Sequence, residues 1–223
     1  MDMKLIVILI FGVLSLFLCL TSSIFTKTEK VKTFIALKGL ASLSYVLLAL
    51  VACNLVFTMK AYPLFIIAGI VVFMFSNIVR AIPTRSDMFH TFYTFIEAIA
   101  FAFLVVSLFF VIEMPLIGLI AGAGAFVVTM ILYLVLRKKD LKKDKLANIA
   151  LILTSSLFLG IGINFAIIFL TAQSFIMAGG AALLFAYVVL QTFTLFTNKK
   201  CVIAKNILLG LGQICLAISI FFI

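Results

Sequence analysis

Three ionisable side chains stand in or beside long apolar stretches of the sequence: Lys38, Arg80 and Glu97. A charge at the centre of a bilayer costs about 3 kcal/mol or more unless it is paired. Glu97 follows His90 and Tyr93 at helical spacing, so the three share one helix face. A carboxyl group in this setting can donate or accept a proton during catalysis. The simpler alternative is a neutral, hydrogen-bonded carboxylic acid.

Lys38 has two interpretations that the sequence leaves open. Ser42 and Tyr45 follow it at helical spacing, which gives this helix a polar face. In the first interpretation the Lys38 ammonium pairs with the Glu97 carboxylate inside the protein. In the second it extends to the nearby membrane surface, because a lysine near the end of a span can keep its charge in water.

Asn77 and Arg80 lie three residues apart within the apolar stretch 69–80. On a helix this spacing places the amide and the guanidinium on the same face. Hydrocarbon solvates neither group, so this face is expected to point toward protein, water or a lipid head group.

Later apolar stretches also carry polar groups, among them Asn164, Gln191 and Gln213. Taken singly, each amide is compatible with an interhelical hydrogen bond beside small residues. Taken together with Lys38 and Asn77, they predict a polar pocket that holds an amphiphile, with its tail along Phe and Leu side chains. The candidate catalytic residues are Glu97 and Asn77, and the candidate substrate-binding residues are Lys38, Tyr45, Arg80, His90, Tyr93, Gln191 and Gln213.

The residue types argue against several other kinds of site. The sequence has one histidine, and a metal site needs several ligands, so neither a metal nor another cofactor is expected. No Gly-x-Ser-x-Gly motif is present, which argues against a serine hydrolase triad. Gly118, Gly122 and Gly124 lie in an apolar stretch, where Gly-xxx-Gly spacing indicates close helix packing rather than phosphate binding.

The elements that must position these groups are membrane-spanning helices. Hydrophobic residues make up 66% of the 223 and charged residues only 11%, against about 25% charged in soluble domains. One crossing takes about 20 apolar residues, and the sequence contains eight such segments. We therefore predict an all-α, polytopic integral membrane protein that forms a single domain. The expected segments are 5–25, 34–57, 64–82, 89–112, 115–136, 147–171, 175–196 and 203–222.

The basic residues predict an orientation. Of the 17 Lys and Arg residues, 14 fall in the connections after the first, third, fifth and seventh segments, and only Lys4 and Lys60 fall on the opposite side. The positive-inside rule places these odd-numbered loops in the cytoplasm and both termini outside the plasma membrane. This distribution accounts for the net charge of +10 without nucleic acid as a partner. The first segment is expected to remain as a span, because no Ala-x-Ala cleavage site follows it.

A weak internal repeat is also present. A shift of 112 residues places 69–77 on 181–189 with a similar apolar pattern, and it places the first segment on the fifth. The shift predicts two parallel halves, 1–113 and 114–223, with a site between them. Apolar sequences resemble one another by default, so chance similarity is the alternative.

Several short patterns resemble the YhhN family of eight-span lysoplasmalogenases, which hydrolyse the vinyl ether of lysoplasmalogens. Lys38-Gly39 resembles the family's Lys-Pro near the start of the second span. Gly69 with Ser76-Asn77 resembles its Gly-x-x-x-x-x-x-Gly-Asp in the third span. The resemblance extends to the family's seventh and eighth spans, through Ala182-Leu-Leu-Phe185, Asn198-Lys199 and Gly212-Gln213.

The resemblance implies a membrane protein that binds a lysolipid-like amphiphile, and it leaves hydrolysis open. The family's aspartates in spans three and seven fall on Asn77 and Val189, and its histidine in span four falls near Glu97. Vinyl ether hydrolysis needs an acid that protonates carbon and a base that activates water. An amide and a valine supply neither, so a catalytic chain would use Glu97 as the acid or base, with Asn77 orienting the substrate.

Two further functions are compatible with the sequence. The first is a small-molecule or lipid transporter in which Glu97 serves as the coupling carboxylate. The second is a non-catalytic structural subunit of a membrane assembly. The sequence does not determine the oligomeric state.

Overall fold

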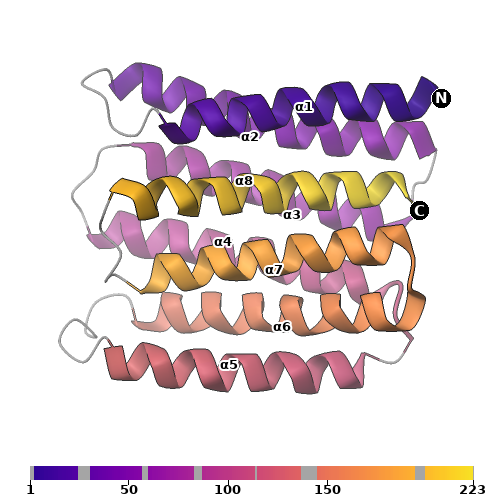
Figure 1. The fold of residues 1–223 in the computed structure, drawn as a ribbon. Helices are drawn as coiled ribbons and strands as arrows, with labels where there is room; N and C mark the ends of the chain where they lie inside the picture. Colours follow the sequence, from indigo (N-terminus) through magenta and orange to yellow (C-terminus); the bar gives the residue numbers. More distant parts are fainter. Residues whose placement is uncertain are drawn as a thin grey trace.

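The described part of the chain consists of eight α-helices joined by short connections, as the computed structural model shows (Figure 1). The described residues are 3–24, 31–56, 60–82, 87–113, 115–136, 145–193 and 199–222. The helices are α1 (Met3–Ile24), α2 (Val31–Val56), α3 (Ala61–Ala81), α4 (Asp87–Phe109), α5 (Leu116–Leu136), α6 (Lys145–Phe169), α7 (Ala172–Thr192) and α8 (Lys199–Phe221). All eight are long and apolar enough to cross a membrane, so the predicted all-α membrane architecture is confirmed.

Several helices begin earlier in the sequence than the apolar pattern predicts. The second predicted segment starts at residue 34, but α2 starts at Val31, and α8 starts at Lys199 rather than at residue 203. The first turn of α2 contains Lys32, and α6 begins at Lys145. A hydropathy pattern marks only the hydrocarbon-facing turns, whereas backbone hydrogen bonding continues into the polar interface. The predicted segments are therefore the apolar centres of slightly longer or shifted helices.

Local sequence explains some of the helix ends. Pro63 stands in the first turn of α3, where its missing N–H leaves no intrahelical bond unmade. Thr171 begins α7 with a capping box, in which its side chain accepts from the Ser174 backbone N–H at 3.3 Å and Ser174 Oγ accepts from the Thr171 N–H at 3.0 Å. Such a box satisfies two N–H groups that the helix itself cannot.

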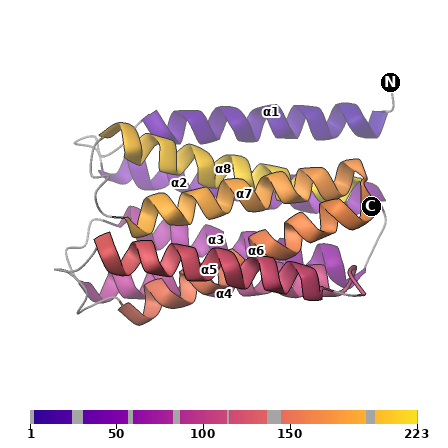
Figure 2. The ribbon, with the colours of Figure 1, turned by 60° about the horizontal axis from the view of Figure 1, so that its bottom comes forward.

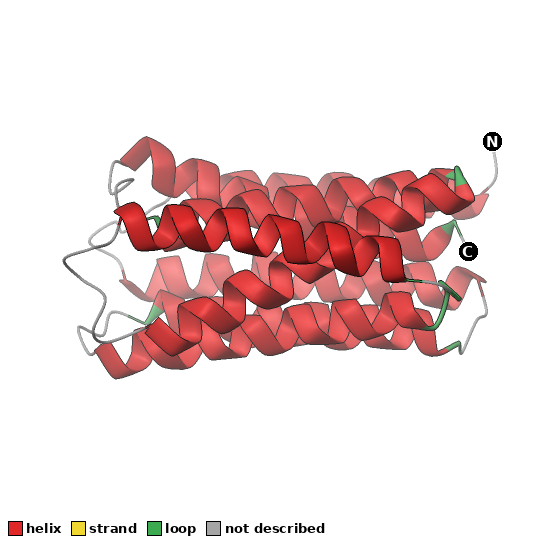
Figure 3. Ribbon diagram, turned by 90° about the horizontal axis from the view of Figure 1, so that it is seen from below, coloured by secondary structure: helices red, strands yellow, loops and turns green. Residues whose placement is uncertain are grey.

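The helices run side by side along one axis, and each is antiparallel to its neighbour in sequence (Figures 1 and 3). α2, α3 and α4 pack in that order, and α8 packs against α1, α2, α3 and α7. α6 contacts α4, α5 and α7 and runs obliquely to them (Figure 2). α1 and α5 lie at opposite edges of the bundle (Figures 1 and 2). The interior is therefore built mainly from α2, α3, α4, α6, α7 and α8.

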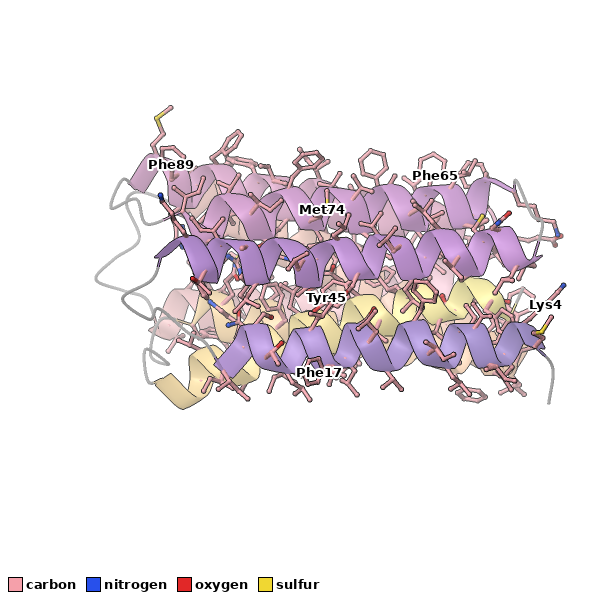
Figure 4. All side chains as sticks on the ribbon, turned by 90° about the horizontal axis from the view of Figure 1, so that it is seen from above. Lys4, Phe17, Tyr45, Phe65, Met74 and Phe89 are labelled. Carbon is pink, nitrogen blue, oxygen red and sulfur yellow. The ribbon has the colours of Figure 1, made fainter. Side chains whose placement is uncertain are left out.

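The outer surface is apolar, as a membrane-spanning bundle requires. Figure 4 shows Phe17 and Phe89 on the outside and Tyr45 in the interior beside α1 and α8. Phe17 is 63% exposed and Tyr45 only 4%. Lipid tails cover outward-facing phenylalanine at no cost, whereas a phenol needs a polar neighbour. The polar groups of the protein are thus gathered inside.

The described helix ends agree with an even number of crossings. The start of α1 and the end of α8 lie at the same end of the bundle (Figure 1). The end of α3, with Arg80, and the starts of α2 and α6, with Lys32 and Lys145, lie at the other end. Most of the basic residues used for the orientation, including 137–143, lie outside the described residues. Which end faces the cytoplasm stays a prediction.

The helix neighbours follow a pattern that bears on the predicted repeat. α1–α2, α2–α3 and α3–α4 contacts have counterparts in α5–α6, α6–α7 and α7–α8, and α2–α8 has a counterpart in α4–α6. The contact between α1 and α8 has no counterpart of similar extent between α5 and α4. This pattern suits two parallel halves, but it does not test common sequence ancestry, and the repeat stays a prediction.

Candidate functional site

Glu97 is the centre of a buried polar cluster formed by α3, α4 and α7. Its side chain is fully buried and forms a salt bridge with Arg80 through Oε1. The same oxygen accepts hydrogen bonds from Ser76 Oγ at 2.8 Å and from the Tyr187 hydroxyl at 2.9 Å. Oε2 accepts one from Gln191 Nε2 at 2.8 Å. Four side chains from two other helices therefore converge on one carboxylate.

The partners of Glu97 present hydrogen-bond donors and one positive charge to its carboxyl group. Arg80 and Gln191 reach Glu97 through N–H groups, which can only donate. The cluster contains one positive and one negative charge, so it adds little net charge to the membrane interior. Glu97 is therefore paired inside the protein, but with Arg80 rather than with Lys38.

Arg80 is held more loosely than its partner. Its guanidinium lies 4.7 Å from the centre of the Tyr93 ring and 5.5 Å from that of Tyr187, close enough for cation–π attraction. Its side chain is 18% exposed, and its Nε and Nη1 atoms are buried without a hydrogen-bond partner among the described residues. A buried N–H group left unpaired costs free energy. Arg80 therefore has donor capacity beyond its contact with Glu97.

A second polar group of residues surrounds a small cavity between α1, α2, α3 and α8. The cavity has a volume of about 10 Å³, which is close to the lower limit for one water molecule. Asn77 Nδ2 donates to Ser42 Oγ at 3.1 Å at its wall. The lining residues are Ser22, Lys38, Ala41, Ser42, Tyr45, Asn77, Asn206, Leu209 and Gly210.

The two clusters meet at α3 but face different helices. Ser76 bonds to Glu97 on α4, whereas the next residue, Asn77, bonds to Ser42 on α2. Asn77 and Arg80, which the spacing places on the same helix face, contact different helices, because Arg80 shares its partner Glu97 with Ser76, four residues earlier. Consecutive helix positions differ by about 100° in direction. A single helix can therefore serve two separate sites.

The proposed pairing of Lys38 with Glu97 is also not what the structure shows. α2, which carries Lys38, packs against α1, α3 and α8, whereas Glu97 lies on α4 and pairs with Arg80. α3 stands between them in the order α2, α3, α4. Arg80 takes the carboxylate because α3 and α4 are direct neighbours.

The other candidate residues lie in several places. The His90 and Tyr93 rings are 4.8 Å apart on α4, on the side of the Arg80 cluster. Gln213 on α8 is fully buried, and neither amide atom has a hydrogen-bond partner among the described residues. Asn164 lies where α6 meets Gly118 of α5. The sequence-predicted groups are thus divided among two clusters and separate helix contacts rather than gathered around one pocket.

Sequence reasoning missed the roles of Ser76 and Tyr187. Each lies one turn before a residue that was singled out, Ser76 before Arg80 and Tyr187 before Gln191. Residues four apart on a helix lie one above the other, so a search for i, i+4 polar pairs would have found both. Among the described residues no group of three or more His, Cys, Asp or Glu side chains is placed to hold a metal.

The fold and these clusters define the chain as a polytopic helical membrane protein with polar groups in its interior. Comparison with models of known protein families, with curated proteins and with solved structures gave no match.

Proposed function

We propose that this chain is a YhhN-like membrane protein that binds a lysolipid-like amphiphile, with the anionic head group of the ligand held by Arg80. The observation that carries the proposal is the pair of buried, unpartnered donor atoms on Arg80, Nε and Nη1. A guanidinium presents its N–H groups as a planar fork that matches the oxygens of phosphate or carboxylate. Glu97 contacts Nη2, which leaves the N–H groups of Nε and Nη1 as the donors for ligand oxygens.

The position of Arg80 suits a ligand that enters from the membrane. Arg80 lies in the last turn of α3, near the end of the bundle, where lipid head groups are found. Large apolar side chains are exposed at the same end of α3 and α4, namely Ile82, Met88, Phe89 and Phe92. An acyl chain can lie along this surface while its head group reaches Arg80. Tyr93, beside the guanidinium, adds an amphipathic ring of the kind common at membrane interfaces.

The cavity beside Lys38 is not the head-group site in this proposal. With a volume of about 10 Å³, it is close to the size of one water molecule and far too small for a lipid head group. In this proposal, the polar pocket expected from the sequence lies near the bundle end rather than beside Lys38. Lys38, Tyr45 and Asn77 remain outside the head-group contact.

Binding is better supported than hydrolysis. Both oxygens of Glu97 already accept hydrogen bonds from protein side chains, so neither oxygen is free to contact a substrate. Asn77 is bonded to Ser42 and cannot replace the missing acid. A hydrolase would need Glu97 released from its partners during the reaction.

Replacing Arg80 with lysine is expected to weaken lysolipid binding about tenfold to a hundredfold. Lysine keeps the charge next to Glu97 but loses the planar fork, and a hydrogen bond to a charged group contributes about 1.5–3 kcal/mol. The measurement is the affinity of purified protein in nanodiscs for lysophosphatidylcholine, compared with a monoacylglycerol of equal chain length. The monoacylglycerol has no phosphate, so its affinity is expected to be lower and unaffected by R80K.

Lys60→Met is the matched control. Lys60 is an exposed cation that stands just before the opposite end of the same helix, and its loss is expected to leave binding unchanged. Equal lysolipid affinity in wild type and R80K would refute the head-group assignment.

An aldehyde-release assay on wild type and the Glu97→Gln variant distinguishes a binding protein from a hydrolase. In our proposal, purified wild-type protein releases no aldehyde from a lysoplasmalogen, and neither does E97Q. Aldehyde release by wild type would replace the binding proposal by the enzyme, and its loss in E97Q protein that is still folded would assign the catalysis to Glu97.

A further inference from the structure

The cavity between α1, α2, α3 and α8 has an unusual polar lining. Its hydrophilic side chains comprise an ammonium group, three hydroxyls and two amides, and none of its lining residues is acidic. These side chains are Lys38, Ser22, Ser42, Tyr45, Asn77 and Asn206. The Ser22 hydroxyl donates to the Cys19 carbonyl at 3.0 Å, so the donors for an occupant are the other five groups. The lining therefore favours a negatively charged occupant over a cation.

Lys38 is the charged member of this group. It is partly buried within α2, and no hydrogen bond or salt bridge joins it to a described residue. The Glu97 carboxylate already forms a salt bridge with Arg80. The Glu113 side chain is exposed at the opposite end of the bundle. A cation within a span needs a counter-charge or water. The described part of the chain provides no carboxylate for it.

Neutral side chains at the same cavity add hydrogen-bond donors. Ser42 Oγ accepts from Asn77 Nδ2 at 3.1 Å, so the Ser42 hydroxyl proton is available to a different acceptor. Ser42 is 2% exposed and Asn77 is 7% exposed, so bulk water does not satisfy them. Tyr45, 4% exposed, brings its hydroxyl to the same wall. These side chains line the same cavity as Lys38.

The size of the cavity limits the occupant. A volume of about 10 Å³ admits one water molecule or, with a small outward movement of the side chains, one monatomic anion. Phosphate, sulfate and carboxylate ligands are too large. We infer that this cavity binds a single halide ion, with chloride as the physiological member of the class, between the Lys38 ammonium and the hydroxyl and amide donors.

This inference differs from the proposed lysolipid site in both residues and ligand. The halide lies between α2, α3 and α8, whereas the head group lies at Arg80 between α3, α4 and α7. The two proposals therefore succeed or fail separately. A bound anion would neutralise Lys38 and hold α1, α2, α3 and α8 together at one place.

Halide dependence of stability tests the inference. Purified protein in neutral detergent is heated in sodium gluconate, and chloride or bromide is then added at constant ionic strength. We expect the melting temperature to rise with halide concentration and to saturate, because a ligand that binds only the folded state stabilises it. Sulfate at equal ionic strength is expected to have no effect.

Two variants and a second measurement make the test decisive. Lys38→Met is expected to abolish the halide effect, and Ser42→Ala to shift saturation to several-fold higher halide, whereas Lys60→Met leaves it unchanged. Broadening of the ³⁵Cl NMR signal by wild-type protein, reversed by bromide, reports binding even where a variant folds poorly. Absence of both effects in wild type, as expected for a cavity that holds only water, would overturn the inference, as would a halide effect that persists in K38M.

Discussion

Replacing Glu97 with glutamine is expected to destabilise the folded protein by about 3–5 kcal/mol, the range for breaking a buried ion pair by removing one partner. The amide can still accept from Ser76 and Tyr187, so the side-chain volume and part of the network remain. The Arg80 guanidinium, however, loses its only salt bridge within the described residues. A buried cation without a counter-charge accounts for most of the expected loss.

Chemical or thermal denaturation in detergent measures this change. The sequence contains no tryptophan but four cysteines, and Cys19 is only 1% exposed. A thiol-reactive dye therefore reports unfolding as the buried cysteine becomes accessible.

A double replacement distinguishes the ion pair from a general packing effect. Arg80→Gln together with E97Q removes both charges and is expected to be more stable than E97Q alone, because no uncompensated charge remains. The coupling between the two positions is read from the full mutant cycle. An E97Q protein as stable as wild type would contradict the ionised pair.

The architecture could be predicted from the sequence because a bilayer leaves few choices. Backbone groups in hydrocarbon must bond within their own segment, so a long apolar run becomes a helix. All eight predicted segments correspond to helices. The ends differ, as at α8, because polar residues such as Lys199 and Lys200 belong to the helix but not to the apolar run.

Three members of the Glu97 cluster were among the residues singled out in the sequence, but the contacts between them were not predicted. Glu97, Arg80 and Gln191 were chosen because hydrocarbon does not tolerate isolated polar groups, and the structure joins all three. Which cation meets Glu97 depends on helix order across the bundle, and α3 separates Lys38 from α4. No periodicity within a single helix contains that information. The division into two clusters follows from the same helix order.

The glycines of α5 show which close helix contacts residue spacing predicts and which it does not. Gly118 and Gly122 were predicted to mark close packing, and a Cβ on either would lie 2.8 or 2.9 Å from an α-carbon of α6. Gly124 was included in the same pattern, but a Cβ there would meet nothing within 4 Å. Residues 118 and 122 are four apart and share a face, whereas Gly124 is turned away. The partner glycine, Gly160 on α6, could be identified only from the structure.

Replacing Gly160 with alanine is expected to destabilise the protein by about 3 kcal/mol, at the upper end of the cost of overpacking. The new methyl group would overlap the backbone of Gly118 and Gly122. Backbone atoms cannot rotate away as a side chain can, so α5 and α6 must separate. α5 packs mainly against α6 and therefore has little other contact to hold it. The measurement is the same thiol-dye denaturation in detergent.

Gly124→Ala is the control that separates this contact from the general effect of glycine in a helix. A methyl group at Gly124 enters open space, and alanine is a better helix former than glycine by about 0.8–1 kcal/mol. G124A is therefore expected to be as stable as wild type or slightly more stable. Because both changes add one methyl group to a span, a difference between them measures the contact between α5 and α6. Equal stability of G160A and G124A would mean that the two helices do not approach as closely as described.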